Sequence, residues 1–335
     1  MTTAIPSAHQ ATDPAAVPVS SPAPRQGNGL SVWPVGQRSP AAQRRGRFVP
    51  GSAAHPARMW PDLAQRIITE YSRPDDLVLD PLCGIGTTLV EAVHAGRDAI
   101  GVDCEHRWTT LATANAALAR VQGGTGQTVV HCGDATTLGE VLPAVLTGRV
   151  DLVVMSPPYG KTMHGRVDHR HGPLRRFHDT YTPDTVPAAA AVAAGDPGTG
   201  VSCEARTRPA PGRQVNLGRR SRLGLADGIT AVLAGCVPFL RPGGLVVVTA
   251  RPWRRGAYLV DLPGAVHTAA LAAGLRPVER CVALLAAVRD ERLVPRHSFF
   301  QLVHVRRARA AGLPVHLPAH EEVLVYQAVG GREPQ

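Results

Sequence analysis

The sequence lacks several features that would place it among membrane, secreted or zinc-ribbon proteins. Its 335 residues contain no long apolar run, and the mean hydropathy of -0.04 excludes a membrane span. The first residues lack the basic and then apolar pattern of a signal peptide, so we expect a cytoplasmic protein. Six cysteines occur without a CxxC pair, which argues against a disulfide framework or a zinc ribbon, and we expect no metal site.

Lysine is nearly absent, since Lys161 is the only lysine among 36 basic residues. The net charge of +10 is spread unevenly: residues 55–160 are net acidic, whereas residues 1–54, 161–222 and 223–335 are each net basic. A polyanionic partner in contact with the basic parts would explain this distribution. Ordinary arginine-rich solubility explains it equally well, so charge alone leaves both interpretations open.

Composition divides the chain into a tail, one domain and an insertion. Residues 1–48 are rich in Ala, Pro, Ser and Gln and poor in large apolar side chains, which predicts a disordered basic tail. Residues 49–330 have the composition of a folded domain. Residues 161–222 interrupt this domain with an alanine-rich and then an arginine-rich stretch, for which we expect a basic, poorly ordered insertion.

Short apolar runs alternate with helical patterns through the predicted domain. This regular alternation predicts parallel βαβ units in a doubly wound α/β sheet. We expect helices at 59–71, 87–95, 107–120, 223–240 and 260–273, and strands at 77–80, 99–103, 128–134, 151–159, 244–250, 279–287 and 321–329.

A glycine-rich loop follows the first predicted strand, in the segment DPLCGIGTT at 80–88. Glycines at a strand-to-helix turn let the backbone approach a ligand closely. Asp103 ends the second strand, where a carboxylate can accept both hydroxyls of a ribose. Asp134 follows the third strand, where a carboxylate can accept an adenine amino group. Contacts at three successive strand ends predict a cofactor that contains adenosine.

The segment Ser156-Pro157-Pro158-Tyr159 ends the fourth predicted strand, at the edge where open α/β sheets bind ligands. Two prolines remove N–H donors and fix φ, so the neighbouring carbonyl groups become rigid acceptors. The ring of Tyr159 adds a stacking face. This combination predicts a site for a planar group with an exocyclic NH2.

Together the two motifs resemble the S-adenosylmethionine-dependent amino-methyltransferases of DNA, the cytosine-N4 and adenine-N6 enzymes. His55-Pro56-Ala57 is similar to the family segment that closes over the methionine end of the cofactor, and AHEEVLVY at 319–326 is similar to the family's last strand. The resemblance covers about residues 49–160 and 215–330. It implies a Rossmann-like class I methyltransferase fold with a mostly parallel, seven-stranded sheet.

The resemblance also implies roles for individual residues. The catalytic residues would be Ser156, Pro157, Pro158 and Tyr159. The residues that bind S-adenosyl-L-methionine would be His55, Asp80, Pro81, Cys83, Gly84, Gly86, Thr87, Thr88, Asp103 and Asp134. For nucleic acid we expect Lys161, Arg251, Trp253, Arg254 and Arg255.

The implied reaction is direct methyl transfer to an exocyclic amine of a DNA base that has been flipped out of the duplex. Acceptors at Ser156 and Pro157 would draw both N–H bonds and localise the amine lone pair. The Ser156 hydroxyl can donate as well as accept, which discriminates only modestly because cytosine and adenine present similar edges. The association of the SPPY motif with cytosine-N4 enzymes adds weight, so the resemblance favours cytosine N4 over adenine N6. An RNA methyltransferase of the tRNA guanine-N2 type and a non-catalytic nucleic-acid binder are the alternatives. We expect DNA or RNA as partner and no membrane, and the sequence identifies no partner nuclease of a restriction–modification system.

Several residues also permit a purely structural role. Cys83 is interpreted mainly as a small packing residue, because the catalytic segment offers no thiolate for carbon-5 chemistry. Trp253 could hold DNA or only cover the end of the sheet. The four histidines of the insertion lack cysteine partners and are interpreted as solvated or phosphate-contacting side chains: His164, His169, His171 and His178.

Overall fold

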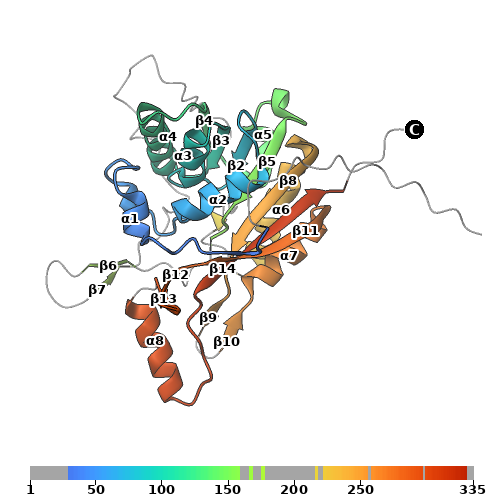
Figure 1. Cartoon of the computed structure of the whole chain (residues 1–335). Coiled ribbons are helices and arrows are strands. Elements are labelled where there is room, and N and C mark those ends of the chain that lie inside the picture. Colours follow the sequence, from blue (N-terminus) through green and yellow to red (C-terminus); the bar gives the residue numbers. More distant parts are fainter. Residues whose placement is uncertain are drawn as a thin grey trace, which may run out of the picture.

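A computed structural model describes residues 29–158, 166–168, 175–177, 216–217, 222–255, 258–296 and 299–329. Its centre is an eight-stranded sheet with the strand order β1-β11-β14-β8-β5-β2-β3-β4 (Figure 1). These strands are β1 (Val32–Trp33), β2 (Leu77–Asp80), β3 (Asp98–Asp103), β4 (Thr128–Cys132), β5 (Val150–Met155), β8 (Leu240–Ala250), β11 (Leu275–Leu284) and β14 (His320–Ala328). The main helices are α1 (Pro40–Arg44), α2 (Pro61–Tyr71), α3 (Thr87–His94), α4 (His106–Val121), α5 (Leu138–Val141), α6 (Arg222–Cys236), α7 (Leu262–Ala272) and α8 (Phe299–Ala310).

The sheet is parallel except for β14, which pairs antiparallel with both β8 and β11. Strand β2 pairs with β3 on one side and with β5 on the other, so the strand order reverses at this point. Ligands of open α/β sheets bind at such a reversal, beyond the carboxyl ends of the strands. The α/β class and the doubly wound, mostly parallel arrangement are confirmed.

Each strand places alternate side chains on opposite faces of the sheet, because the side-chain period of a strand is two. On β5, Val153 and Met155 pack into a core covered by α6 and α7, whereas Leu152 and Val154 pack into a core covered by α2, α3 and α4. Both faces of the central strands are therefore buried, which explains why their sequences are continuously apolar.

Residues 29–48 correct the prediction of a disordered tail. Val32 and Trp33 add β1 to the edge of the sheet beside β11, and the seven expected strands become eight. Trp33 is 3% exposed, with its ring 6.1 Å from that of Tyr71 on α2. A segment with few apolar residues can still fold by completing a core that the domain supplies. Residues 1–28 lie outside the described residues.

The predicted insertion is described at only a few points. β6 (Arg166–Asp168) and β7 (Arg175–Phe177) pair as a hairpin, and the four histidines of the insertion lie outside the described residues. Asn216 and Leu217 are 5% and 4% exposed, and Leu217 belongs to the main core. The last part of the predicted insertion is therefore part of the domain, as is Arg222, where α6 begins.

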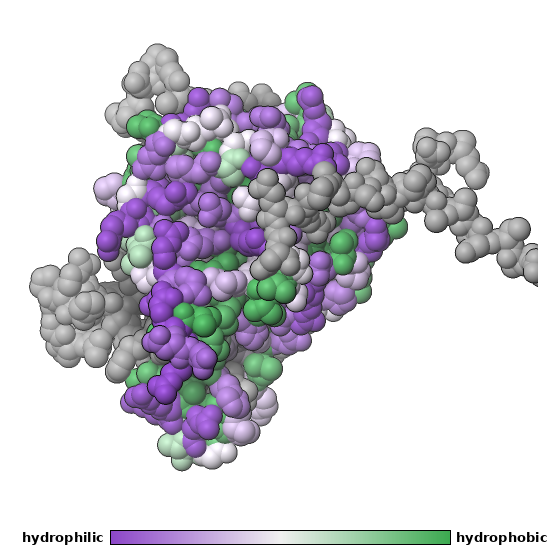
Figure 2. Space-filling view, in the orientation of Figure 1, coloured by the Kyte–Doolittle hydropathy of each residue, from purple (hydrophilic) through white to green (hydrophobic). Residues whose placement is uncertain are grey.

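Three elements beyond the strand ends were not predicted from the sequence. They are the hairpin of β9 (Trp253–Arg255) with β10 (Tyr258–Val260), the hairpin of β12 (Ala286–Arg289) with β13 (Arg292–Pro295), and the helix α8. The first hairpin directly follows β8, and the other two elements connect the end of β11 to the start of β14. They therefore lie at the edge where the parallel strands end (Figure 1). In the lower half of the view, where these elements lie, Figure 2 shows hydrophobic residues gathered among hydrophilic ones.

Within the described ranges, no helix combines the length and the apolar character needed to cross a membrane. The same ranges hold no group of three or more His, Cys, Asp or Glu side chains arranged for a metal ion.

Candidate active site

A cavity of about 330 Å³ lies beyond the carboxyl ends of β2, β3, β4 and β5, at the reversal of the strand order. Most of the predicted site residues border it. Its lining is Arg44, His55, Pro56, Ala57, Arg58, Met59, Trp60, Asp80, Leu82, Cys83, Gly84, Ile85, Thr87, Thr88, Asp103, Cys104, Asp134, Ala135, Ser156, Pro157, Pro158, Asn216, Leu217, Arg251 and Glu321. The volume is in the range of small-molecule sites.

The glycine loop between β2 and α3 requires glycine for two different reasons. Gly84 has φ of +52°, and a Cβ atom there would lie 2.9 Å from Nε2 of His55. Gly86 has φ of +79° and directly precedes α3, and a Cβ atom there would lie 3.0 Å from the Cβ of Ala112 on α4. L side chains rarely adopt such φ values. Gly84 therefore brings the loop against the cavity wall, and Gly86 brings α3 close to α4.

Two carboxyl groups stand at neighbouring strand ends, that of Asp80 buried and that of Asp103 partly exposed. Asp80 ends β2 and accepts the N–H of Leu82 at 3.0 Å. Asp103 ends β3 and accepts the N–H of Gly84 at 3.1 Å and that of Glu105 at 2.8 Å. Burial raises the pKa of Asp80 to about 6 and that of Asp103 to about 7. Each carboxylate oxygen can accept a second hydrogen bond, so Asp103 can hold the loop and still accept ligand hydroxyls.

Asp134 follows β4 and lies on the cavity lining. Its Oδ1 accepts the N–H of Thr136 at 2.9 Å and the hydroxyl of Thr136 at 2.7 Å, so it caps the short 3-10 helix Ala135–Thr137. This cap fixes the orientation of the carboxylate. The three predicted acidic positions are thus brought together at one cavity, as the strand ends predicted.

The catalytic segment predicted from the sequence begins directly after β5. Ser156, Pro157 and Pro158 all line the cavity, on the strand that neighbours β2. Tyr159 lies outside the described residues, as does Lys161. The glycine loop and the Ser-Pro-Pro segment, 70 residues apart in the chain, therefore face the same volume.

His55 forms one wall of the cavity. Its ring meets Trp108 of α4 edge to face at a centroid distance of 4.6 Å, and its Nδ1 accepts the N–H of Ala57 at 3.3 Å. Asn115 on α4 supports this wall: its Oδ1 accepts the N–H of Val49 at 2.7 Å, and its Nδ2 donates to the carbonyl of Ile85 at 2.8 Å. The side chain of Asn115 is fully buried and ties the N-terminal segment to the glycine loop.

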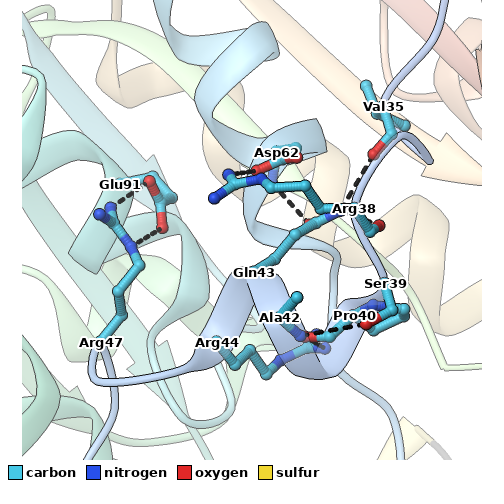
Figure 3. A network of polar contacts seen from close by, with 10 residues as sticks. All are labelled: Val35, Arg38, Ser39, Pro40, Ala42, Gln43, Arg44, Arg47, Asp62 and Glu91. Carbon is cyan, nitrogen blue, oxygen red and sulfur yellow. Dashed lines mark hydrogen bonds and ion pairs between the residues drawn. The ribbon is translucent and has the colours of Figure 1, made fainter.

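The N-terminal segment is also held by a polar network (Figure 3). Arg47 donates to Glu91 of α3 through Nε at 3.2 Å and Nη2 at 2.6 Å. Gln43 is 1% exposed and donates to the carbonyls of Val35 and Arg38, each at 3.0 Å. Burial raises the pKa of Glu91 to about 7. The segment RRGR at 44–47 therefore turns two of its arginines toward the domain and leaves Arg45 exposed.

Sequence reasoning missed several residues of the lining. Glu321, which begins the segment EEVLVY of β14, is 7% exposed and lies 3.9 Å from Arg251. Asn216 donates to Oε1 of Glu105 at 2.8 Å. The likeness of 319–326 to the family's last strand was the only available signal for Glu321. No sequence pattern indicated that Arg44, Arg58 or Asn216 would line the cavity, because their approach to it depends on the tertiary fold.

Some predicted site residues are placed elsewhere. Pro81 is buried and, like Gly86, is absent from the lining. Trp253 is 7% exposed in the main core, so it covers the end of the sheet and offers little surface to DNA. The side chains of Arg254 and Arg255 lie outside the described part of the chain. Cys83 lines the cavity, but burial raises the pKa of its thiol well above the ordinary value, as expected of a packing residue.

Parts of this chain are similar in sequence to known methyltransferases. Residues 7–114 match the family model described as DNA methylase. A type II methyltransferase, M.MthZI, of Methanothermobacter thermautotrophicus is 46% identical over 50 residues, which are 15% of this chain and 14% of that protein. A tRNA (guanine(10)-N2)-dimethyltransferase of Methanocaldococcus jannaschii is 34% identical over 107 residues, which are 32% of this chain and 30% of that protein.

Among solved structures, TrmN from Thermus thermophilus aligns with 86% of this chain and 53% of its own, at a TM-score of 0.44 and 16% identity. The matches to the two curated relatives span less than a third of the length of those proteins. The family match includes the glycine loop and the predicted ribose-binding strand end, and both lie at the cavity just described. Residues 7–114 of this chain are therefore similar to the DNA methylase family, and the type II methyltransferase relatives agree with this similarity.

Proposed function

We propose that this chain transfers a methyl group from S-adenosylmethionine to an exocyclic amine of a DNA base, with cytosine N4 favoured over adenine N6. One observation carries the proposal: the Ser156–Pro158 segment and the glycine loop at Gly84 border the same cavity. A donor site and an acceptor-amine site must share one volume for direct transfer, since both reacting atoms have to lie within contact distance.

The chemistry of the lining suits S-adenosylmethionine, whose bound form supplies a methyl group on a sulfonium centre. Asp103 offers carboxylate oxygens for ribose hydroxyls, and Asp134 offers them for the adenine amino group. Asp80 places a further carboxyl group beside the glycine loop, which favours a cationic ligand. Arg44 and Arg58 add positive charge to the lining beside His55 and Met59, which favours binding of the carboxylate group of an amino acid.

The work of this chain on the target base is to hold and polarise its amine. In this proposal the Ser156 hydroxyl and the Pro157 carbonyl, both on the cavity lining, accept the two N–H bonds, which localises the lone pair on nitrogen. Pro157 has no N–H and a fixed φ, so its position is set before the base arrives. The Ser156 hydroxyl can also donate to the ring acceptor beside the amine, which is N3 in cytosine and N1 in adenine. The preference for cytosine N4 therefore depends mainly on the resemblance of the Ser-Pro-Pro-Tyr segment to cytosine-N4 enzymes.

The elements around α8 support DNA as the partner. Residues 292–320 contain five arginines and four histidines and no Asp or Glu. The described residues of this stretch, 292–296 and 299–320, lie at the edge of the sheet that carries the cavity. Arg292, Arg306 and Arg307 are exposed. Such a basic surface neutralises phosphates and positions a duplex without reading its sequence. In this proposal, the base enters the cavity while α8 and its neighbouring hairpin hold the backbone. The type II methyltransferase relatives also favour a role in a restriction–modification system, with a partner nuclease that the structure does not identify.

An RNA substrate is the second candidate. The tRNA dimethyltransferase relative matches 32% of this chain, twice the share matched by the type II methyltransferase M.MthZI. A guanine N2 amine is also exocyclic and planar with its ring, so the same acceptors could polarise it.

The test is to incubate purified protein with labelled S-adenosylmethionine and either unmodified duplex DNA or total RNA, then digest the product to nucleosides and identify them by mass. We expect N4-methylcytosine from DNA. N6-methyladenine alone would move the proposal to adenine, and label in RNA alone would replace it with the second candidate. Ser156→Ala should keep cofactor binding and lose most turnover. Full activity in Ser156→Ala would show that the acceptor site lies elsewhere.

A further inference from the structure

Beside the part of the lining formed by residues 55–59 lies a guanidinium group that the protein satisfies only in part. Arg44 lines the cavity, and its Nη1 and Nη2 donate to backbone carbonyls of Pro40 at 3.3 Å, Arg58 at 3.2 Å and Met59 at 2.6 Å. Its Nε is buried and has no hydrogen-bond partner among the described residues. A buried donor without a partner is costly, so the protein alone leaves the Arg44 guanidinium incompletely satisfied.

The charge of Arg44 is also uncompensated at short range. Within the described chain, no carboxylate forms an ion pair with it, and the groups close to it are backbone carbonyls and a second arginine. Burial, followed by the charge of Arg58, lowers the pKa of Arg44 to about 10, while the more distant Glu91 opposes this effect. Arg45, the next residue, is exposed. The sequence therefore places one cation inward, at the cavity, and its neighbour outward.

The lining of the cavity therefore carries charges of both signs. Asp80, Asp103 and Asp134 supply carboxylates at the strand ends, whereas Arg44 and Arg58 supply positive charge where residues 55–59 form the wall. A ligand with an anionic group at one end and a cation and hydroxyls elsewhere matches this arrangement. Guanidinium groups bind carboxylates strongly because both are planar and can form parallel hydrogen bonds.

We infer that Arg44 binds the α-carboxylate at the amino-acid end of the methyl donor, and that the N-terminal segment is in this way part of the cofactor site. This inference rests on the proposed function, since it takes S-adenosylmethionine as the ligand. Arg44 is preorganised for this role, because three backbone carbonyls fix its guanidinium before the ligand binds. The segment that carries it is fixed in turn by the pair of Arg47 with Glu91.

The experiment compares two ligands that differ only in this group. Isothermal titration calorimetry measures the affinity of the full chain for S-adenosylmethionine and for decarboxylated S-adenosylmethionine, which keeps the amine and the sulfonium. We expect the wild-type chain to bind the complete cofactor at least tenfold more tightly. Arg44→Gln should lose at least tenfold in affinity for S-adenosylmethionine and less than twofold for the decarboxylated ligand. Arg45→Gln, with the same change of charge at an exposed position, should leave both affinities unchanged.

The outcomes separate this inference from the proposed function. Equal wild-type affinity for both ligands would overturn the role of the carboxylate while S-adenosylmethionine binding stands, and this comparison needs no variant. An equal loss for both ligands in Arg44→Gln would assign Arg44 to the fold alone and overturn the inference. Unchanged S-adenosylmethionine affinity in Arg44→Gln would also overturn it and leave nucleic-acid phosphate as the anion for Arg44. A wild-type chain that binds neither ligand would refute the proposed function itself.

Discussion

The ion pair between Arg47 and Glu91 tests whether residues 29–48 belong to the folded domain. Glu91 lies on α3 with 2% of its side chain exposed, whereas Arg47 is 30% exposed. Removing one partner of a buried pair costs about 3–5 kcal/mol, because the other charge stays buried without compensation. Arg47 is partly exposed, so we expect a smaller loss than for a fully buried pair: Arg47→Ala should lower the free energy of unfolding at pH 8 by roughly 2–4 kcal/mol.

The size of this loss should depend on pH. Burial raises the pKa of Glu91 to about 7, and the Arg47 charge opposes that rise. Without Arg47 the pKa of Glu91 rises further, so the carboxyl takes up a proton near neutrality. A group whose pKa is higher in the folded state contributes stability that is present at low pH and lost as the pH rises through that value. The defect of Arg47→Ala should therefore be largest at pH 8 and shrink toward pH 5.5.

Urea unfolding at both pH values, followed by circular dichroism, measures this effect. Arg45→Ala is the matched control, since it removes an exposed arginine two residues away and should unfold at the wild-type urea concentration. Glu91→Gln should cost less than Arg47→Ala, because Arg47 can turn toward water whereas Glu91 cannot. Identical unfolding of Arg47→Ala and Arg45→Ala at pH 8 would refute the reasoning and return this segment to the status of a solvated tail.

Three further predictions concern ligands. Asp103→Ala should weaken cofactor binding by about 1.5–3 kcal/mol, the value of hydrogen bonds to a charged group, and unchanged affinity in calorimetry would remove Asp103 from the ribose site. Affinity for 5′-methylthioadenosine should rise from pH 6 to pH 8, because Asp80 and Asp103, with pKa values of about 6 and 7, become stronger acceptors when ionised; a fall would contradict their ligand role. The variant Arg306→Gln/Arg307→Gln should flatten the dependence of log K for DNA on log salt by about 0.9 for each phosphate that it no longer neutralises, and an unchanged slope would place the DNA surface elsewhere.

The central sheet was predictable because its signals are local. The predicted strands at 77–80 and 99–103 correspond to β2 and β3, and the predicted helix at 59–71 corresponds to α2. Apolar runs that are buried on both faces, separated by helices, leave few alternatives to a doubly wound sheet. The site followed from the same logic, since polar residues at the ends of parallel strands must meet at one edge.

The elements at the edges of the molecule were less predictable, because no local sequence pattern distinguishes them from their neighbours. The predicted strand at 279–287 combines the end of β11 with part of β12, since the apolar pattern runs on through the turn between them. Trp33 is a lone large apolar residue in a polar stretch of sequence, and only the fold supplies the ring of Tyr71 for it to pack against. Arg44 and Arg45 are identical in sequence terms, yet one faces the cavity and the other faces solvent.

The uneven charge of the chain acquires a physical explanation from this arrangement. The acidic stretch 55–160 supplies the three aspartates of the cavity, and two of them have raised pKa values because burial costs an ionised carboxylate its solvation. That cost opposes folding of the ligand-free chain above neutral pH, and a bound cation with hydroxyl donors reduces it. Any ligand that binds the folded form alone also stabilises it by mass action. A cationic adenosine cofactor should therefore raise the melting temperature of this chain more at pH 8 than at pH 6, whereas an uncharged surface site would give the same increase at both.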